Sequence, residues 1–169
     1  MSEDRANCCL TFQILASGLG VVSGSVAFPV FTFLYGNISA GVWAALSVLI
    51  ALMVFHLHLL YRSVSVLSSV QTGVLTDLLS SYRNFRLESW HTGHSLAATR
   101  NLGLLTLTAG AAASLYYFYT HIAQGEEMFP IADNSLIAGV WALMCVKWGL
   151  ALAWSAHQYR LQYREYSLI

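Results

Sequence analysis

The sequence predicts an all-α integral membrane protein, a four-helix transmembrane bundle. Hydrophobic residues make up 57% of the 169 residues and charged residues only 9%, whereas a soluble domain carries about 25% charged residues. The apolar residues gather into four runs, each long enough for the roughly 20 residues that a spanning helix needs. These predicted spans are Leu10–Tyr35, Val42–Tyr61, Leu102–Thr120 and Asn134–Ala156. We therefore expect one membrane domain over residues 1–169, with a long connection over residues 62–101.

Several classes of protein are excluded by what the chain lacks. The first span is not expected to be a secretory signal, because it follows Met1-Ser-Glu-Asp-Arg5 without a basic region and is too long. The cysteines Cys8, Cys9 and Cys145 lie outside the inter-helix loops, which excludes a disulfide-stapled ectodomain. Net charge is zero, so we expect no nucleic-acid partner. No nucleotide-binding loop, nucleophile elbow or intramembrane carboxylate pair is present, so we do not expect an enzyme.

The distribution of basic residues predicts the orientation in the membrane, because Lys and Arg gather in short cytoplasmic loops. The loop His121–Asp133 has no Lys or Arg, and Gly36–Gly41 has no charge. The long connection and the C-terminal tail hold Arg62, Arg83, Arg86, Arg100, Arg160 and Arg164. Both termini and the long connection are therefore predicted to be cytoplasmic. Asn37-Ile38-Ser39 is a glycosylation sequon on the outer side, but its short loop leads us to expect no modification.

Small residues and one proline predict how the spans pack. Gly20 and Gly24 lie four apart in the first span, and Gly103, Gly110 and either Ala113 or Ser114 share one face of the third. Such positions let helices approach closely in a membrane, so we expect packing within the bundle, with homo-oligomerisation as the alternative. Pro29 is expected to kink the first span. An apolar stripe over Val64–Phe85 predicts that a helix follows the second span or lies on the inner leaflet. An ordinary helical loop packed under the bundle is the alternative.

Lys147 is the charged residue near the middle of the fourth predicted span. A charge at the bilayer centre costs about 2.5–3.5 kcal/mol on insertion scales, so this lysine is expected to face the bundle interior or a polar cavity. The four spans contain no Asp or Glu. Its partner is then backbone carbonyls, water, a lipid phosphate or an anionic ligand. A structural lysine and a lysine paired with an acidic substrate both remain open.

Histidines lie toward both ends of the predicted spans. His56 and His58 lie in the second span near its cytoplasmic end, on nearly opposite helix faces, so at most one faces the bundle centre easily. His121 closes the third span on the outer side, and His157 ends the fourth on the inner side. An intramembrane histidine is suited to binding a ligand, metal or proton. Hydrogen bonding to a neighbouring helix is the alternative.

Three short patterns resemble one family. They are Val140-Trp141 with Lys147-Trp148, Ala156-His157-Gln158-Tyr159-Arg160 and Ser167-Leu168 near the C-terminus; His58-Leu-Leu-Tyr61 at the end of the second span; and Tyr119-Thr-His121 at the exit of the third. Together they resemble the heme-responsive-gene family of small four-span eukaryotic heme transporters. The tail departs from that family's aromatic–Ala–Arg–Lys–Tyr form, because here it is Tyr163-Arg-Glu-Tyr166.

The resemblance implies transport of heme, bound in passing as substrate rather than as a permanent cofactor. The family's heme-interacting positions fall on His58 and His121, which would contact the iron, and on Tyr159, Arg160, Tyr163, Arg164 and Tyr166 in the tail. The extra His56 leaves the choice of second-span ligand open. Heme is a flat apolar ring with two carboxylates and an iron that accepts imidazole nitrogen. Histidine could therefore hold the iron and Lys147 or Arg160 a propionate, with His157 toward the inner mouth.

The tail also predicts a location. Tyr166-Ser-Leu-Ile169 fits a tyrosine-based sorting signal that clathrin adaptors read on endosomal and lysosomal cargo. We expect an endosomal, lysosomal or plasma membrane protein that moves heme toward the cytosol. The alternatives are a four-span scaffold or trafficking protein that transports nothing, and a b-type electron carrier with His58 and His157 paired on heme.

Overall fold

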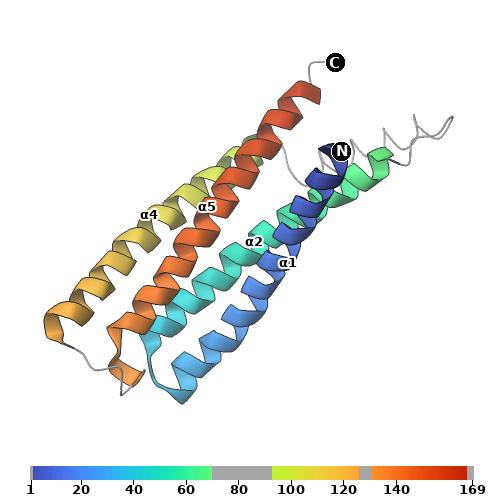
Figure 1. Cartoon of the computed structure of the whole chain (residues 1–169). Helices are drawn as coiled ribbons and strands as arrows, with labels where there is room; N and C mark the ends of the chain where they lie inside the picture. Colours follow the sequence, from blue (N-terminus) through green and yellow to red (C-terminus); the bar gives the residue numbers. More distant parts are fainter. Residues whose placement is uncertain (1, 70–92, 126–130, 167–169) are drawn as a thin grey trace.

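A computed structural model describes residues 2–69, 93–125 and 131–166. The described elements are all helical (Figure 1). The long helices are α1 Ser2–Pro29, α2 Ile38–Ser69, α4 Gly93–Gln124 and α5 Ser135–Tyr166. Two short helical turns complete them, a π-helical turn η1 Val30–Leu34 and a 3-10 turn η2 Ile131–Asp133. Residues 167–169 of the sorting signal and residues 70–85 of the apolar stripe lie outside the described residues.

Four segments of these helices are long and apolar enough to cross a membrane: Leu10–Leu34, Ile38–Tyr61, His94–Gln124 and Ser135–Leu161. The predicted all-α four-helix bundle is thus confirmed, and the chain is a multi-pass membrane protein. The helices run beyond the predicted spans, since α2 continues to Ser69 and α4 begins at Gly93. Glycine weakens a helix mainly in its interior, so Gly93 at the first position does not prevent α4 from forming.

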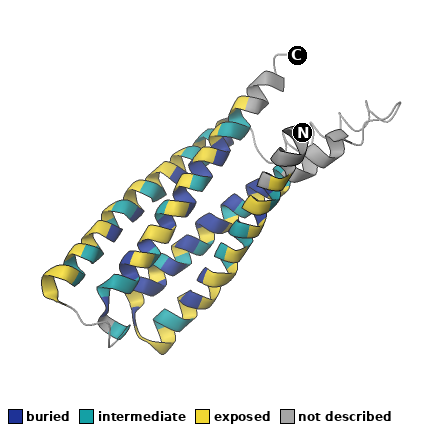
Figure 2. Ribbon diagram, in the orientation of Figure 1, coloured by how far each residue is buried: buried dark blue, intermediate teal, exposed yellow. Residues whose placement is uncertain are grey.

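The helices pack in the order α4, α5, α2, α1, with extensive contacts between successive members of this series (Figure 1). Helix α1 begins and α5 ends at the same end of the bundle, which the charge distribution predicts to be cytoplasmic. Buried residues concentrate on the inner helices α2 and α5 (Figure 2). The core there includes Val54, Leu57, Trp148, Leu152 and Ala156. The outer faces of α1 and α4 present apolar side chains, as lipid-facing surfaces do.

Helix α1 changes its hydrogen-bond pattern after Pro29. Proline has no backbone N–H and cannot continue the α-helical ladder. A π-helical turn follows over Val30–Leu34, and the amide of Tyr35 donates to the carbonyl of Val30 over 3.1 Å. This π-helical turn follows the proline at which a kink was predicted, and it brings Thr32 against Gly41 at the start of α2.

Glycines bring α4 and α5 into backbone contact. A methyl group placed on Gly149 would lie 2.8 Å from both the carbonyl oxygen of Gly103 and the amide nitrogen of Leu107. One on Gly110 would lie 2.9 Å from the carbonyl oxygen of Ala142. Real side-chain carbons do not occupy such positions, so these glycines are required for the observed packing. The predicted role of Gly103 and Gly110 within the bundle is confirmed.

Asn37 joins two loops at the end of the bundle opposite the chain termini, which the charge distribution predicts to be the outer end. It is only 5% exposed, and its side-chain amide donates to the carbonyls of Ile131, over 3.0 Å, and Asn134, over 3.2 Å. Its side-chain oxygen accepts from the amide of Ala40 and so caps α2. The nitrogen to which a glycan would attach is therefore engaged and buried, which is a second reason to expect no modification of the sequon.

We predict that Asn37→Ala lowers the free energy of unfolding by about 1–3 kcal/mol, because buried carbonyls lose their donor and α2 loses its cap. Thermal unfolding of the purified protein in detergent measures this loss. Ser39→Ala is the matched control, since it removes the same sequon while leaving these hydrogen bonds intact. Equal destabilisation by the two variants would contradict the explanation.

Candidate functional site

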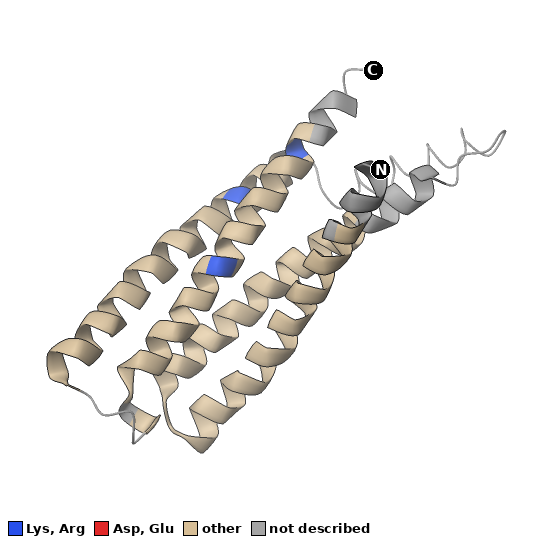
Figure 3. Ribbon diagram, viewed as in Figure 1, with Lys and Arg blue, Asp and Glu red and all other residues tan. Residues whose placement is uncertain are grey.

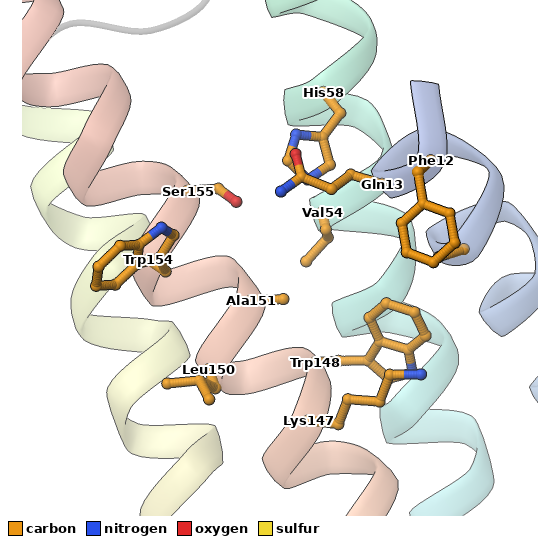
Figure 4. A pocket seen from close by; sticks show the side chains of 11 residues that line it. Phe12, Gln13, Val54, His58, Lys147, Trp148, Leu150, Ala151, Trp154 and Ser155 are labelled. Carbon is orange, nitrogen blue, oxygen red and sulfur yellow. The ribbon is translucent and has the colours of Figure 1, made fainter. Parts of the chain in front are cut away.

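An apolar cavity of about 490 Å³ lies between α1, α2 and α5 (Figure 4). Aliphatic and aromatic side chains make up most of its wall, with Phe12 from α1 and both Trp148 and Trp154 from α5. Four polar side chains reach it: Gln13, His58, Lys147 and Ser155. In Figure 4 the side chains of Gln13 and His58 lie at one end, and those of Trp148 and Lys147 at the other. A wall of this kind suits a large apolar ligand that carries a few polar groups.

Trp148 forms one end of this cavity by reaching from α5 to α1. Its indole is 5% exposed and occupies the space that the missing side chain of Gly20 leaves on α1. On the same helix Trp154 is 62% exposed, so its ring lies on the outer surface beside the cavity. Gly20 was predicted to let another helix backbone approach closely. It instead makes room for the aromatic ring of Trp148.

His58 is the buried histidine of the second span, at 3% exposure, whereas His56 lies on the exposed face of α2. The structure therefore resolves which of the two faces the bundle. The Nδ1 atom of His58 lies 2.7 Å from the hydroxyl oxygen of Tyr159, across the contact between α2 and α5. Because this bond engages Nδ1, Nε2 is the ring nitrogen left to meet a ligand in the cavity.

Two tyrosines extend the His58 contact toward the predicted cytoplasmic end. The rings of Tyr61 and Tyr159 stack with centroids 4.4 Å apart and planes 15° apart. The ring of Tyr159 also meets the His58 imidazole edge to face, with centroids 6.1 Å apart. Residues from α2 and α5 are thus linked in one polar and aromatic cluster, which we call the His58 cluster (His58, Tyr61 and Tyr159).

Lys147 lines the cavity, but its surroundings differ from those expected. Its side chain is exposed rather than enclosed, and the cavity beside it is apolar rather than polar. The ammonium nitrogen lies 4.5 Å from the centroid of the Trp148 ring, a geometry in which the aromatic face attracts the cation. The described part of the chain shows no Asp or Glu in its helical spans (Figure 3). A cation at the mouth of an apolar cavity can receive an anionic group.

His121 lies far from this cavity. Leu96 of α4 packs in the same core cluster as Leu57, and His121 follows Leu96 by 25 positions. At about 1.5 Å per residue this separates His121 from the level of His58 by about 38 Å along the helix. The two histidines therefore cannot bind the same iron atom, and they could act only as separate stations.

Other predicted site residues do not converge on the cavity. His157 is exposed on α5, and Tyr159 instead of His157 meets His58, so the pair required by a b-type electron carrier is not formed. Arg160 is half-buried and does not line the cavity. The side chains of Tyr163, Arg164 and Tyr166 lie outside the described part of the chain. Among the described residues, no group of three His, Cys, Asp or Glu could hold a metal ion.

Several cavity residues were not predicted from the sequence. Gln13 and Phe12 belong to α1, for which the sequence predicted no contact with a ligand. Ser155 lies on the same face of α5 as Trp148 and Ala151. The single amide within the apolar first span was a usable signal for Gln13. The seven-residue spacing of Trp148 and Ser155 also places them on one helix face.

Comparisons of the chain with models of known protein families, with curated proteins and with solved structures find no match. The resemblance drawn from the short patterns therefore remains a prediction.

Proposed function

We propose that this membrane protein binds heme in the cavity between α1, α2 and α5 and transports it toward the cytosol, in an endosomal, lysosomal or plasma membrane. The observation that carries the proposal is the chemistry of one cavity, which joins an imidazole, an apolar aromatic wall and an ammonium group. Heme offers the complementary groups: an iron that accepts imidazole nitrogen, a flat apolar ring and two propionates.

The arrangement of these groups along α5 supports binding of a single extended molecule. Lys147 precedes Ser155 by eight positions, which corresponds to about 12 Å along the helix. His58 and Ser155 lie at one end of the cavity, and Lys147 lies at the other end (Figure 4). In the proposed pose Nε2 of His58 binds the iron, Trp148 lies against the ring, and Lys147 meets a propionate through a charge-assisted hydrogen bond.

A single axial histidine suits a transporter. Within the described cavity His58 is the one histidine, so iron bound there keeps a position open for exchange. His121 on the outer side would then be an earlier station, and the tail residues Arg160, Tyr163, Arg164 and Tyr166 later ones. The sorting signal Tyr166-Ser-Leu-Ile169 would direct the protein to endosomes or lysosomes through an adaptor.

Hemin titration and a transport assay together test the proposal. We expect the purified protein to be colourless, to bind hemin with a shifted Soret band, and to restore growth of a heme-auxotrophic cell at low external heme. Absence of hemin binding would reject the proposal in favour of a membrane scaffold. Co-purification with permanently bound heme and no support of growth would also reject it.

Lys147 provides a more specific test. We expect Lys147→Met to weaken hemin binding by about 10- to 150-fold, since a hydrogen bond to a charged group contributes about 1.5–3 kcal/mol. Lys147→Arg should retain part of the affinity, because the charge remains on a larger, planar group. Equilibrium titration in detergent measures both. Folding of Lys147→Met should be unimpaired, because no described carboxylate loses a partner.

Esterified heme completes this test. The wild type should bind the dimethyl ester of heme more weakly than it binds hemin. Lys147→Met should bind the ester and hemin about equally well, as a double-mutant cycle requires for a direct pair. Equal losses on esterification in the two proteins would show that Lys147 does not contact the propionates.

A further inference from the structure

The His58 cluster contains a tyrosine that contacts the proposed ligand-binding histidine without entering the cavity. His58 lines the cavity and Tyr159 does not, yet the Tyr159 hydroxyl lies 2.7 Å from Nδ1 of His58. The two nitrogens of an imidazole lie on different edges of the ring. A partner that engages Nδ1 therefore fixes where Nε2 points.

We propose that Tyr159 is a positioning residue for His58, a role that rests on the proposed binding of heme iron by this histidine. When Nε2 gives its lone pair to iron, the proton of the neutral ring lies on Nδ1. The Tyr159 oxygen accepts that proton in a hydrogen bond, because a phenol can accept as well as donate. This bond selects the tautomer that binds iron and holds the ring toward the cavity.

The surroundings of Tyr159 explain how it can hold this orientation. Its ring stacks on Tyr61, which follows His58 by three positions and so shares its face of α2. On α5 its neighbour Ala156 is fully buried in the contact with α2. Tyr159 is thus held between two side chains of one helix while its backbone belongs to another, and the hydroxyl is fixed relative to the imidazole.

The role differs from the direct heme contact that the family resemblance implies for Tyr159. A hydrogen bond from Nδ1–H makes the imidazole a stronger electron donor to the metal. It should therefore strengthen iron binding and favour the ferric state. Removing only the hydroxyl should weaken binding and raise the reduction potential of the bound heme, while leaving the aromatic stack in place.

Tyr159→Phe and Tyr61→Phe form a matched pair of variants for this test. Each removes one hydroxyl from the same stacked pair, but only Tyr159 bonds to His58. We expect Tyr159→Phe to weaken hemin binding about tenfold, within the range typical for loss of a group that hydrogen-bonds to a metal ligand, and to raise the midpoint potential of the bound heme. Tyr61→Phe should leave both quantities close to the wild-type values. Unchanged affinity and potential in Tyr159→Phe would overturn the proposal.

The same substitution in a His58→Ala background shows whether Tyr159 acts through His58. There Tyr159→Phe should cause no further loss of affinity, because the group that it positions is absent. A full additional loss would indicate direct contact with heme or a general effect on folding, and would overturn the positioning role. If the wild type binds no hemin at all, the proposed function itself fails, which is a different result from wild-type binding that Tyr159→Phe does not alter.

Discussion

Replacing His58 with Ala is expected to weaken hemin binding at least about 100-fold and to abolish heme-dependent growth. Loss of a group that only hydrogen-bonds to a metal ligand typically changes metal affinity about 10–100-fold, so loss of the proposed ligand itself should cost more. The Soret band should also return toward that of hemin free in detergent. Equilibrium titration and growth of heme-auxotrophic cells measure the two effects.

The matched control for this prediction is His56, which precedes His58 by two positions. His56 has the same chemistry and the same helix, but it lies on the exposed face of α2. His56→Ala should bind hemin as the wild type does. His58→Gln keeps a polar side chain beside Tyr159, so it separates loss of the iron ligand from loss of a buried hydrogen bond. Strong binding by His58→Ala, or weak binding by His56→Ala, would show that the ligand is misassigned.

Gly149→Ala is expected to destabilise the bundle by about 3 kcal/mol or more. Overpacking of a core usually costs about 1–3 kcal/mol, and here the added methyl group would meet backbone atoms of Gly103 and Leu107 at 2.8 Å, which cannot rotate away. Because whole proteins are stable by only about 5–15 kcal/mol, the yield of folded protein should fall sharply. Thermal unfolding in detergent and size-exclusion chromatography measure this.

Gly18→Ala makes the same chemical change in another span, with the opposite expectation. A methyl group there would lie 3.6 Å from the Phe55 ring, an ordinary contact. Since alanine favours helix over glycine by roughly 1 kcal/mol, Gly18→Ala should be neutral or stabilising. If Gly149→Ala is as stable as Gly18→Ala, then α4 and α5 do not pack through their backbones.

The fold was largely predictable because membrane thickness sets the length of an apolar run. The positions at which the helices end were less predictable. Arg100 and Asn101 end the apolar window of the third span, yet α4 extends back to Gly93, because helical hydrogen bonding does not require apolar side chains. The glycines of α4 were also predictable, since their spacing marks one helix face. Their partner Gly149 was not predicted, because which faces meet depends on the order of packing.

The candidate site was only partly predictable. Helical spacing indicated that His56 and His58 cannot both face inward, but choosing between them required knowledge of where α5 lies. Lys147 was expected to avoid apolar surroundings, and the structure instead places it against Trp148. The contact between His58 and Tyr159 joins residues 101 positions apart in the chain. No pattern within one helix predicts such a contact.

The Asn37 hydrogen bonds and the glycine contacts together restrict how the bundle could open. Backbone contact makes α4 and α5 one rigid pair of helices. At the predicted outer end, hydrogen bonds of Asn37 join the turn before α2 to the segment before α5. At the opposite end α2 and α5 meet through the side chains of the His58 cluster and the buried apolar core beside it. Any separation of the two hairpins that preserves these contacts would therefore open the bundle at the end where the chain begins.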